Sequence, residues 1–224
     1  MKAKIIIVLL CIATAGYAQN NVVNIERGTN RIDAFLSRDR NAPVDADGSP
    51  FVSEDFILAE LDGFEKRYEV RYNAAQDVMQ FKNEKGEVMV MNYLDQQTIK
   101  LLDGSGKVYQ TVMYENGKRG MAVLLWENEA GVALYAKEQI EFYPREEPTA
   151  GGYGVPKRAR FERLGDLHYM RDEEGGLLKP IPIKKKDFYV AFKEKDMKSY
   201  LKKNKLSFKE GADLKKIMTY YYGN

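Results

Sequence analysis

Apolar and polar residues alternate along most of residues 51–143. In one clear run, Tyr68, Val70 and Tyr72 alternate with Glu69 and Arg71. Successive side chains of a β-strand point to opposite faces, so a spacing of two predicts strands. The same pattern recurs at residues 79–81, 88–90, 99–101, 108–114, 121–126 and 132–143.

Short turn segments separate these runs. Residues 83–86, 103–106 and 128–131 are rich in Asn, Asp and Gly, and Asn116-Gly117 is a strong hairpin signal. Strands joined by such short turns are antiparallel, because a crossover helix needs a dozen or more residues. We therefore expect a meander of about six to eight strands and no parallel α/β fold.

The alternation stops at residues 144–157, which contain three Pro and three Gly, and resumes at residues 160–171. Residues 172–176 then offer another turn. We interpret residues 144–157 as a long loop between strands rather than as a linker between domains. The sheet is expected to continue to about residue 183.

From Lys184 onward the apolar residues recur every three or four positions with lysines between them, which is typical of amphipathic helices. Ser207 and Glu210 stand at the spacing of a capping box and predict the start of the last helix there. The apolar positions are Phe188, Tyr189, Phe192, Met197, Tyr200, Leu201, Leu214, Ile217, Met218 and Tyr221.

These patterns predict a mainly β (α+β) fold: an antiparallel meander sheet or partly closed barrel with two or three short C-terminal helices. We expect an irregular lead-in at residues 19–50, a β domain at residues 51–183 and a basic helical cap at residues 184–224, packed on the sheet. An apolar content of 44% fits a globular chain with an ordinary core.

Residues 1–18 have the order of a secretory signal peptide. Lys2 and Lys4 precede a short apolar run at residues 5–12, and small residues follow up to Ala18. The apolar run is shorter than the roughly 20 residues that span a bilayer, so we expect cleavage rather than anchoring. Cleavage after Ala18 would make Gln19 the first mature residue of a periplasmic or extracellular protein.

The single cysteine, Cys11, lies inside this segment. Lipoprotein signals need a small residue just before the cysteine, whereas Leu10 precedes Cys11, so we do not expect lipidation. A mature chain that begins at Gln19 contains no cysteine, and disulfides cannot stabilise it.

The formal net charge of +2 hides an asymmetry. Residues 184–224 contain twelve Lys and five acidic residues, a net charge of +7, which leaves about −7 on residues 19–183. An exported chain rarely meets nucleic acid, so an acidic protein, lipopolysaccharide or anionic lipid is the expected partner of such a segment. The alternative is that these lysines only solvate the outer faces of helices.

Residue types limit the chemistry. His168 is the only histidine and lies in a predicted strand, so we assign it no catalytic role and expect no structural zinc. The stretch 104–107 resembles the end of a phosphate loop, but lacks the upstream glycine and the following Ser or Thr, and we interpret it as a hairpin turn. Residues 45–48 resemble a calcium loop without its further ligands.

Four segments of the chain are distinctive: the Tyr72-Asn73 step, Gln-Asp-Val-Met-Gln-Phe at residues 76–81, Leu-Tyr-Ala-Lys at residues 134–137 and Asp-Leu-Lys-Lys-Ile-Met-Thr-Tyr-Tyr at residues 213–221. In these segments the chain resembles a group of uncharacterised secreted proteins of Bacteroidota. The resemblance implies an exported envelope protein and carries over no functional residue.

The sequence thus predicts an exported, non-catalytic interaction protein of the envelope or periplasm, with a protein or envelope-surface partner. We assign no catalytic, cofactor-binding or metal-binding residue. Two alternatives remain open: an enzyme that cleaves envelope polysaccharide with paired carboxylates, and a small-ligand binder with a pocket inside a closed sheet. Two convergent carboxylates in a pocket would favour the first, and an apolar cavity the second.

Overall fold

A computed structural model describes residues 36–38, 45–92, 97–147, 155–172 and 175–223 of the chain. The predicted signal peptide, Cys11 and the predicted cleavage site lie outside these residues. Within them, no helix is long and apolar enough to cross a membrane.

The described residues form a mainly antiparallel β structure with three short C-terminal helices, which confirms the predicted fold class. The strands are β1 (Leu36–Arg38), β2 (Ile57–Leu61), β3 (Arg67–Asn73), β4 (Val78–Lys82), β5 (Val88–Met91), β6 (Thr98–Leu101), β7 (Val108–Met113), β8 (Arg119–Glu127), β9 (Ala133–Lys137), β10 (Ile140–Tyr143), β11 (Arg160–Arg163), β12 (Leu167–Arg171) and β13 (Lys179–Pro180).

Eleven of these strands form one open sheet in the order β1-β5-β4-β3-β2-β6-β7-β8-β9-β12-β13. Neighbours along the chain mostly pair, as a meander requires, but β6 does not pair with β5. The chain instead returns to the free edge of β2, where Ala59 lies opposite Leu101. The sheet therefore grows from β2 in both directions.

Strand β2 was missed by the pattern analysis. Its sequence is Ile-Leu-Ala-Glu-Leu, and Leu58 points to the solvated face with 44% of its surface exposed. An apolar residue on the polar face hides the alternation on which the prediction depends. With β2, and with residues 132–143 divided into β9 and β10, the described part of residues 51–143 holds nine strands rather than six to eight.

The Asn116-Gly117 hairpin forms as predicted between β7 and β8. Gly117 has a φ of +76°, which is strained for other residues, and its N–H donates to the Tyr114 carbonyl at 2.9 Å. The tight turn sets the register in which Met113 lies opposite Arg119.

The inward faces of the strands form the main core. Large side chains with almost no exposure fill it, among them Phe81, Ile99 and Tyr109. This cluster contains 15 of the 30 buried apolar residues of the described chain.

Residues 175–180 form a strap across one face of β8 and β9. The Leu178 N–H donates to the carbonyl of Met113, the last residue of β7, at 2.7 Å. Pro180, at the end of the strap, pairs with Tyr169 of β12. Leu178 packs under the strap against Tyr135 and Ala122. The strap thus adds a wall to the open sheet.

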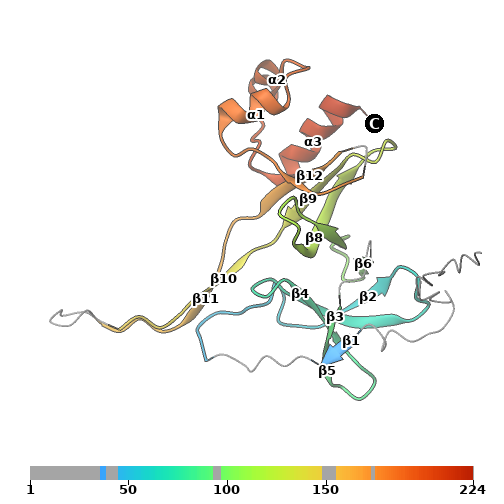
Figure 1. Ribbon diagram of the computed structural model, residues 1–224, viewed down its shortest axis with the longest axis vertical. Helices are drawn as coiled ribbons and strands as arrows, with labels where there is room; N and C mark the ends of the chain where they lie inside the picture. Colours follow the sequence, from blue (N-terminus) through green and yellow to red (C-terminus); the bar gives the residue numbers. More distant parts are fainter. Residues whose placement is uncertain (1–35, 39–44, 93–96, 148–154, 173–174, 224) are drawn as a thin grey trace, which may run out of the picture.

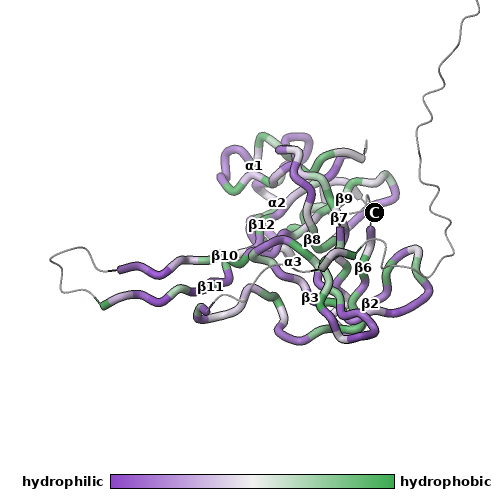
Figure 2. The backbone as a smooth tube through the Cα atoms, turned by 60° about the horizontal axis from the view of Figure 1, so that its bottom comes forward, coloured by the Kyte–Doolittle hydropathy of each residue, from purple (hydrophilic) through white to green (hydrophobic). Residues whose placement is uncertain are grey.

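Strands β10 and β11 leave the sheet as a two-stranded arm, which projects from the rest of the chain in both views (Figures 1 and 2). Phe142 and Phe161 face each other across it with ring centroids 5.1 Å apart. Of the Pro- and Gly-rich stretch 144–157, Glu146 and Lys157 still pair across the arm, as expected for a loop between two strands, and residues 148–154 are outside the described residues. Asp47, from the lead-in, pairs with the β11 side of the arm.

The helices α1 (Lys185–Ala191), α2 (Met197–Asn204) and α3 (Gly211–Tyr222) lie together against the β8, β9 and β12 side of the sheet (Figure 1). Their apolar faces enclose a second core, in which Phe188, Leu214 and Ile217 are fully buried around Leu134 of β9. The helical spacing of the C-terminal apolar residues is therefore explained by docking onto the sheet.

The predicted capping box at Ser207 and Glu210 is wrong. Helix α3 begins at Gly211, and its N-cap residue Glu210 makes no side-chain cap. The Asp213 carboxylate instead accepts the Ser207 N–H at 3.0 Å. A carboxylate in the first helical turn thus reaches back to the preceding loop, so the box spacing indicated the right region and the wrong partners.

Candidate functional site

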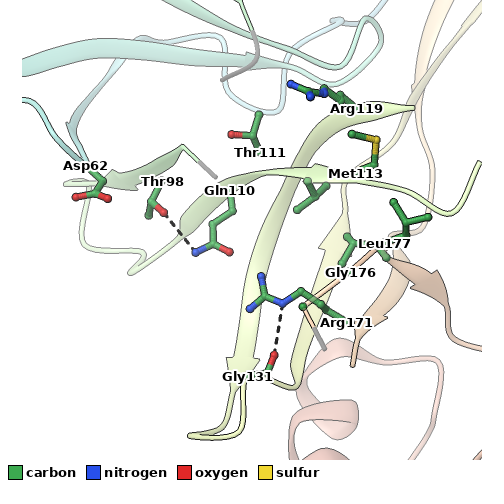
Figure 3. A pocket seen from close by; sticks show the side chains of 13 residues that line it. Asp62, Thr98, Gln110, Thr111, Met113, Arg119, Gly131, Arg171, Gly176 and Leu177 are labelled. Atoms are coloured by element: carbon green, nitrogen blue, oxygen red, sulfur yellow. Dashed lines mark hydrogen bonds between the residues drawn. The ribbon is translucent and has the colours of Figure 1, made fainter. Parts of the chain in front are cut away.

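An open groove of about 750 Å³ lies on the face of the sheet that carries the strap. Strands β6 and β7 form its floor and one side, and the strap with the end of β12 forms the other (Figure 3). It is lined by Asp62, Thr98, Gln110, Thr111, Val112, Met113, Arg119, Gly131, Arg171, Gly175, Gly176, Leu177 and Leu178.

A chain of hydrogen bonds fixes the polar floor of the groove. The buried Tyr135 hydroxyl donates to Gln110 Oε1 at 2.8 Å, and Gln110 Nε2 donates to the Thr98 hydroxyl at 3.4 Å. Burial raises the pKa of Tyr135 to about 12, so this hydroxyl keeps its proton at neutral pH. The Gln110 carboxamide is therefore held in one orientation.

Arg171 of β12 extends toward this carboxamide (Figure 3). Three groups hold its guanidinium in place. It forms an ion pair with Glu127, it donates to the Gly131 carbonyl at 3.4 Å, and it lies 5.6 Å from the centroid of the Tyr135 ring. A guanidinium has five N–H donors, more than these contacts use, so the groove presents a fixed cation with donors to spare.

The far end of the groove carries Asp62, which is the one carboxylate in the described lining. Its backbone is fixed, since its N–H donates to the Thr98 carbonyl at 3.0 Å and its carbonyl accepts Gln97 Nε2 at 2.9 Å. The lining is therefore polar, rich in donors and oppositely charged at its two ends. Such a groove suits an extended ligand with amide groups and a carboxylate.

A second cavity of about 190 Å³ is lined by residues of β2, β3, β4, β6 and β7 and of the loops beside them. Its described lining contains one carboxylate, Asp103, whose pKa is lowered by hydrogen bonds from Ser105. Tyr72 and Tyr109 meet at its wall with ring centroids 5.0 Å apart. Neither hollow thus brings two carboxylates into its described lining.

Two carboxylates, the half-buried Asp77 and the buried Glu138, are instead engaged by cations and hydroxyls inside the fold. The first forms the Asp77 cluster, defined by Tyr72, Asp77, Met121 and Lys137. Asp77 Oδ1 accepts the Tyr72 hydroxyl at 2.7 Å and the Met121 N–H at 3.0 Å, and Asp77 forms an ion pair with Lys137. Burial lowers the pKa of Lys137, and the neighbouring Asp77 carboxylate opposes that effect.

The second forms the Glu138 cluster of Lys107, Tyr109, Glu138 and Arg163. Glu138 accepts Lys107 Nζ at 3.0 Å, the Tyr109 hydroxyl, and an Arg163 N–H at 3.4 Å. Burial, and then the Glu138 charge, raises the pKa of Tyr109. Glu138 lies between β9, which ends at Lys137, and β10, which begins at Ile140. Both clusters join strands distant in sequence, which is a structural role.

The residues singled out by their type lie away from the groove. His168 of β12 is half-buried beside Gly211, and burial lowers its pKa. Residues 104–106 form part of the predicted turn between β6 and β7. Asp47 of the calcium-like stretch forms an ion pair with Arg158, and no group of three metal-ligating side chains gathers anywhere in the described chain.

The lysines of the cap all point to solvent. Lys216 forms an ion pair with Asp213 at 3.1 Å, and Lys195 donates to the Tyr220 carbonyl at 2.7 Å. In the described structure, the side-chain ammonium groups of the other ten make no hydrogen bond or ion pair; they are Lys184, Lys185, Lys186, Lys193, Lys198, Lys202, Lys203, Lys205, Lys209 and Lys215.

Sequence reasoning missed the groove. Gln110 and Arg171 come from strands 61 positions apart, and the strap that completes the wall is too irregular to show a pattern. One local signal was available for the Asp77 cluster, because Lys137 directly follows four buried residues of β9. A charged residue at such a position requires a partner.

No protein-family model matches the chain, and neither the curated proteins nor the solved structures include a significant match.

Proposed function

We propose that this protein is an exported, non-catalytic interaction protein of the cell envelope or periplasm, and that its groove holds an extended, carboxylate-bearing segment of a protein partner. One observation carries the proposal: a guanidinium held by Glu127 and Gly131 stands in an open polar groove of about 750 Å³. Export is supported by the signal-peptide pattern of residues 1–18.

The groove favours binding over the two alternatives. Acid-pair cleavage of a polysaccharide needs two carboxylates that flank the bond, whereas Asp62 is the one carboxylate of the described groove lining. A pocket inside a barrel needs a closed sheet, and this sheet is open. A rigid cation beside fixed amide and hydroxyl groups is a recognition surface that needs no chemical step.

A library of short peptides tests the proposal. Each peptide is displayed with a free C-terminal carboxylate and again as the amide, and selected peptides are measured against the purified protein by fluorescence anisotropy. We expect the acid forms to bind and Arg171→Lys to weaken them by about tenfold or more. Lysine keeps the charge beside Glu127 but loses the fork that holds a carboxylate.

Arg67→Lys is the matched control, because Arg67 of β3 forms an exposed ion pair with Glu60 of β2, outside the groove. It should leave the affinity unchanged. The proposal fails if acid and amide peptides bind equally well, or if Arg171→Lys and Arg67→Lys have the same effect.

A further inference from the structure

Two apolar side chains stand out on the surface of the lysine-rich cap. Ile183 and Val190 are 69% and 63% exposed. Their neighbours in sequence are buried, since Ile181 is 6% exposed and Phe188 is fully enclosed. The segment thus has enough apolar side chains to fill the core and two more that are directed outward.

The exposed residues lie on α1 and beside its two ends. Lys186 and Val190 are four positions apart in α1, which places them on one side of the helix, and the exposed Lys193 follows its C-terminal end at Ala191. Phe188 and Phe192 occupy the opposite side and pack into the second core. Ile183 and Lys184 precede the helix and extend this surface, called here the α1 face: residues 183–186, Val190 and Lys193.

The charge of this face is mostly uncompensated. Asp187 and Glu194 are the acidic residues within α1 and its C-terminal flank, against Lys184, Lys185, Lys186 and Lys193. None of these lysines forms an ion pair with a described residue. The whole cap carries a net charge of +7.

We propose that the α1 face attaches the protein to the surface of an anionic phospholipid bilayer. Lysines next to an anionic bilayer are attracted to the phosphate headgroups, and exposed apolar side chains beside them enter the boundary between headgroups and acyl chains. A soluble polyanion would use the lysines but would give Ile183 and Val190 no apolar environment. The attachment is peripheral, and it leaves the groove on another part of the sheet available.

Vesicle co-sedimentation tests this proposal with the protein as it is exported and processed by the cell. The probes are vesicles of equal parts phosphatidylglycerol and phosphatidylcholine, vesicles of phosphatidylcholine alone, and soluble dextran sulfate. Three variants are compared: Lys184→Gln/Lys185→Gln/Lys186→Gln, Ile183→Ser/Val190→Ser, and the control Lys85→Gln/Lys100→Gln/Lys118→Gln. The control removes the same charge from exposed positions on β6 and in the β4–β5 and β7–β8 turns, away from the α1 face.

The protein should bind the anionic vesicles and not those of phosphatidylcholine alone. A lysine near such a surface contributes about fivefold, so the first variant should bind on the order of 100-fold more weakly, and the control should bind like wild type. The second variant should lose about tenfold on vesicles and nothing on dextran sulfate. The proposal is overturned if the control loses as much as the first variant, if the serine variant binds vesicles normally, or if only dextran sulfate binds.

Discussion

The Asp77 cluster offers a sharp test of how the fold is held together. Replacing Asp77 with Asn keeps an acceptor for the Tyr72 hydroxyl and the Met121 N–H, and Asn tolerates the positive φ of +58° at this position. The substitution removes the negative charge that faces Lys137. We therefore expect Asp77→Asn to destabilise the protein by leaving a buried ammonium without its counter-charge.

The magnitude follows from burial. Removing one partner of a fully buried ion pair costs about 3 to 5 kcal/mol. Here the Lys137 side chain is 13% exposed and that of Asp77 is 28% exposed, so water reaches part of the pair. We expect a loss of about 2 to 3 kcal/mol in the free energy of unfolding at pH 7, or about 5 to 10 °C in the melting temperature.

The loss should depend on pH with a definite sign. Burial already lowers the pKa of Lys137, and Asp77→Asn removes the charge that opposes this effect. A lysine whose pKa is lower in the folded state binds fewer protons there than in the unfolded state, so stability rises with pH up to the ordinary lysine pKa of about 10.4. The difference between variant and wild type should therefore shrink between pH 7 and pH 10.

Urea unfolding of both proteins at pH 7 and pH 10 measures these differences. Tyrosine ionisation is common to both proteins and cancels in the comparison. Glu60→Gln serves as the control, because it breaks the exposed pair with Arg67 and should cost less than 1 kcal/mol. If Asp77→Asn costs no more than Glu60→Gln, or if the difference grows with pH, the cluster does not hold the strands as described.

Four further outcomes are expected. Deleting the chain from Ser207 onward should abolish the cooperative thermal transition, since it removes α3 and three of the nine buried residues of the second core, and an unchanged midpoint would refute docking. The free energy of unfolding should fall as the pH rises from 10 to 12, because burial raises the pKa of Tyr135 to about 12 in the folded protein; a free energy that stays constant over this range would contradict this. His168→Gln should leave the peptide and vesicle affinities unchanged, and a loss of either with intact circular dichroism would give His168 a functional role. Intact-mass measurement of the exported protein should give a chain that begins at Gln19, whereas a diacylglycerol adduct at Cys11 would overturn the signal-peptide interpretation.

Local chemistry made the hairpins predictable. Asn116-Gly117 forms a tight turn whatever surrounds it, and the alternation at residues 68–72 survives in β3 because only one face of the strand is buried. The helices were visible for the same reason, since their apolar spacing records which side meets the sheet. The partner of Ser207 was predicted wrongly, because both Glu210 and Asp213 are close to Ser207 in sequence. The conformation of the loop before α3 brings Asp213, and not Glu210, to the Ser207 N–H.

Long-range pairing decided what remained hidden. The return of β6 to β2, the strap at Leu178 and the contact of Asp77 with Lys137 each join residues more than 35 positions apart. A single sequence contains no local signal for such pairings. The groove depends on two of these pairings, that of β6 with β2 and that of the strap with β7. Its lining residues could therefore not be predicted from sequence motifs.

The position of β2 in the middle of the sheet has a consequence for folding. Strands β3 to β5 follow β2 directly through short turns and can pair as soon as they are made. The other edge of β2 waits for β6, which begins at Thr98, 41 positions after Ile57. Until then, β2 presents unpaired backbone groups beside the exposed Leu58, which is the geometry that recruits strands from other chains. Synthesis of this protein at high concentration should therefore favour aggregation through the β2 edge. A partner that shields this edge would raise the folding yield without contacting any surface that the folded protein exposes.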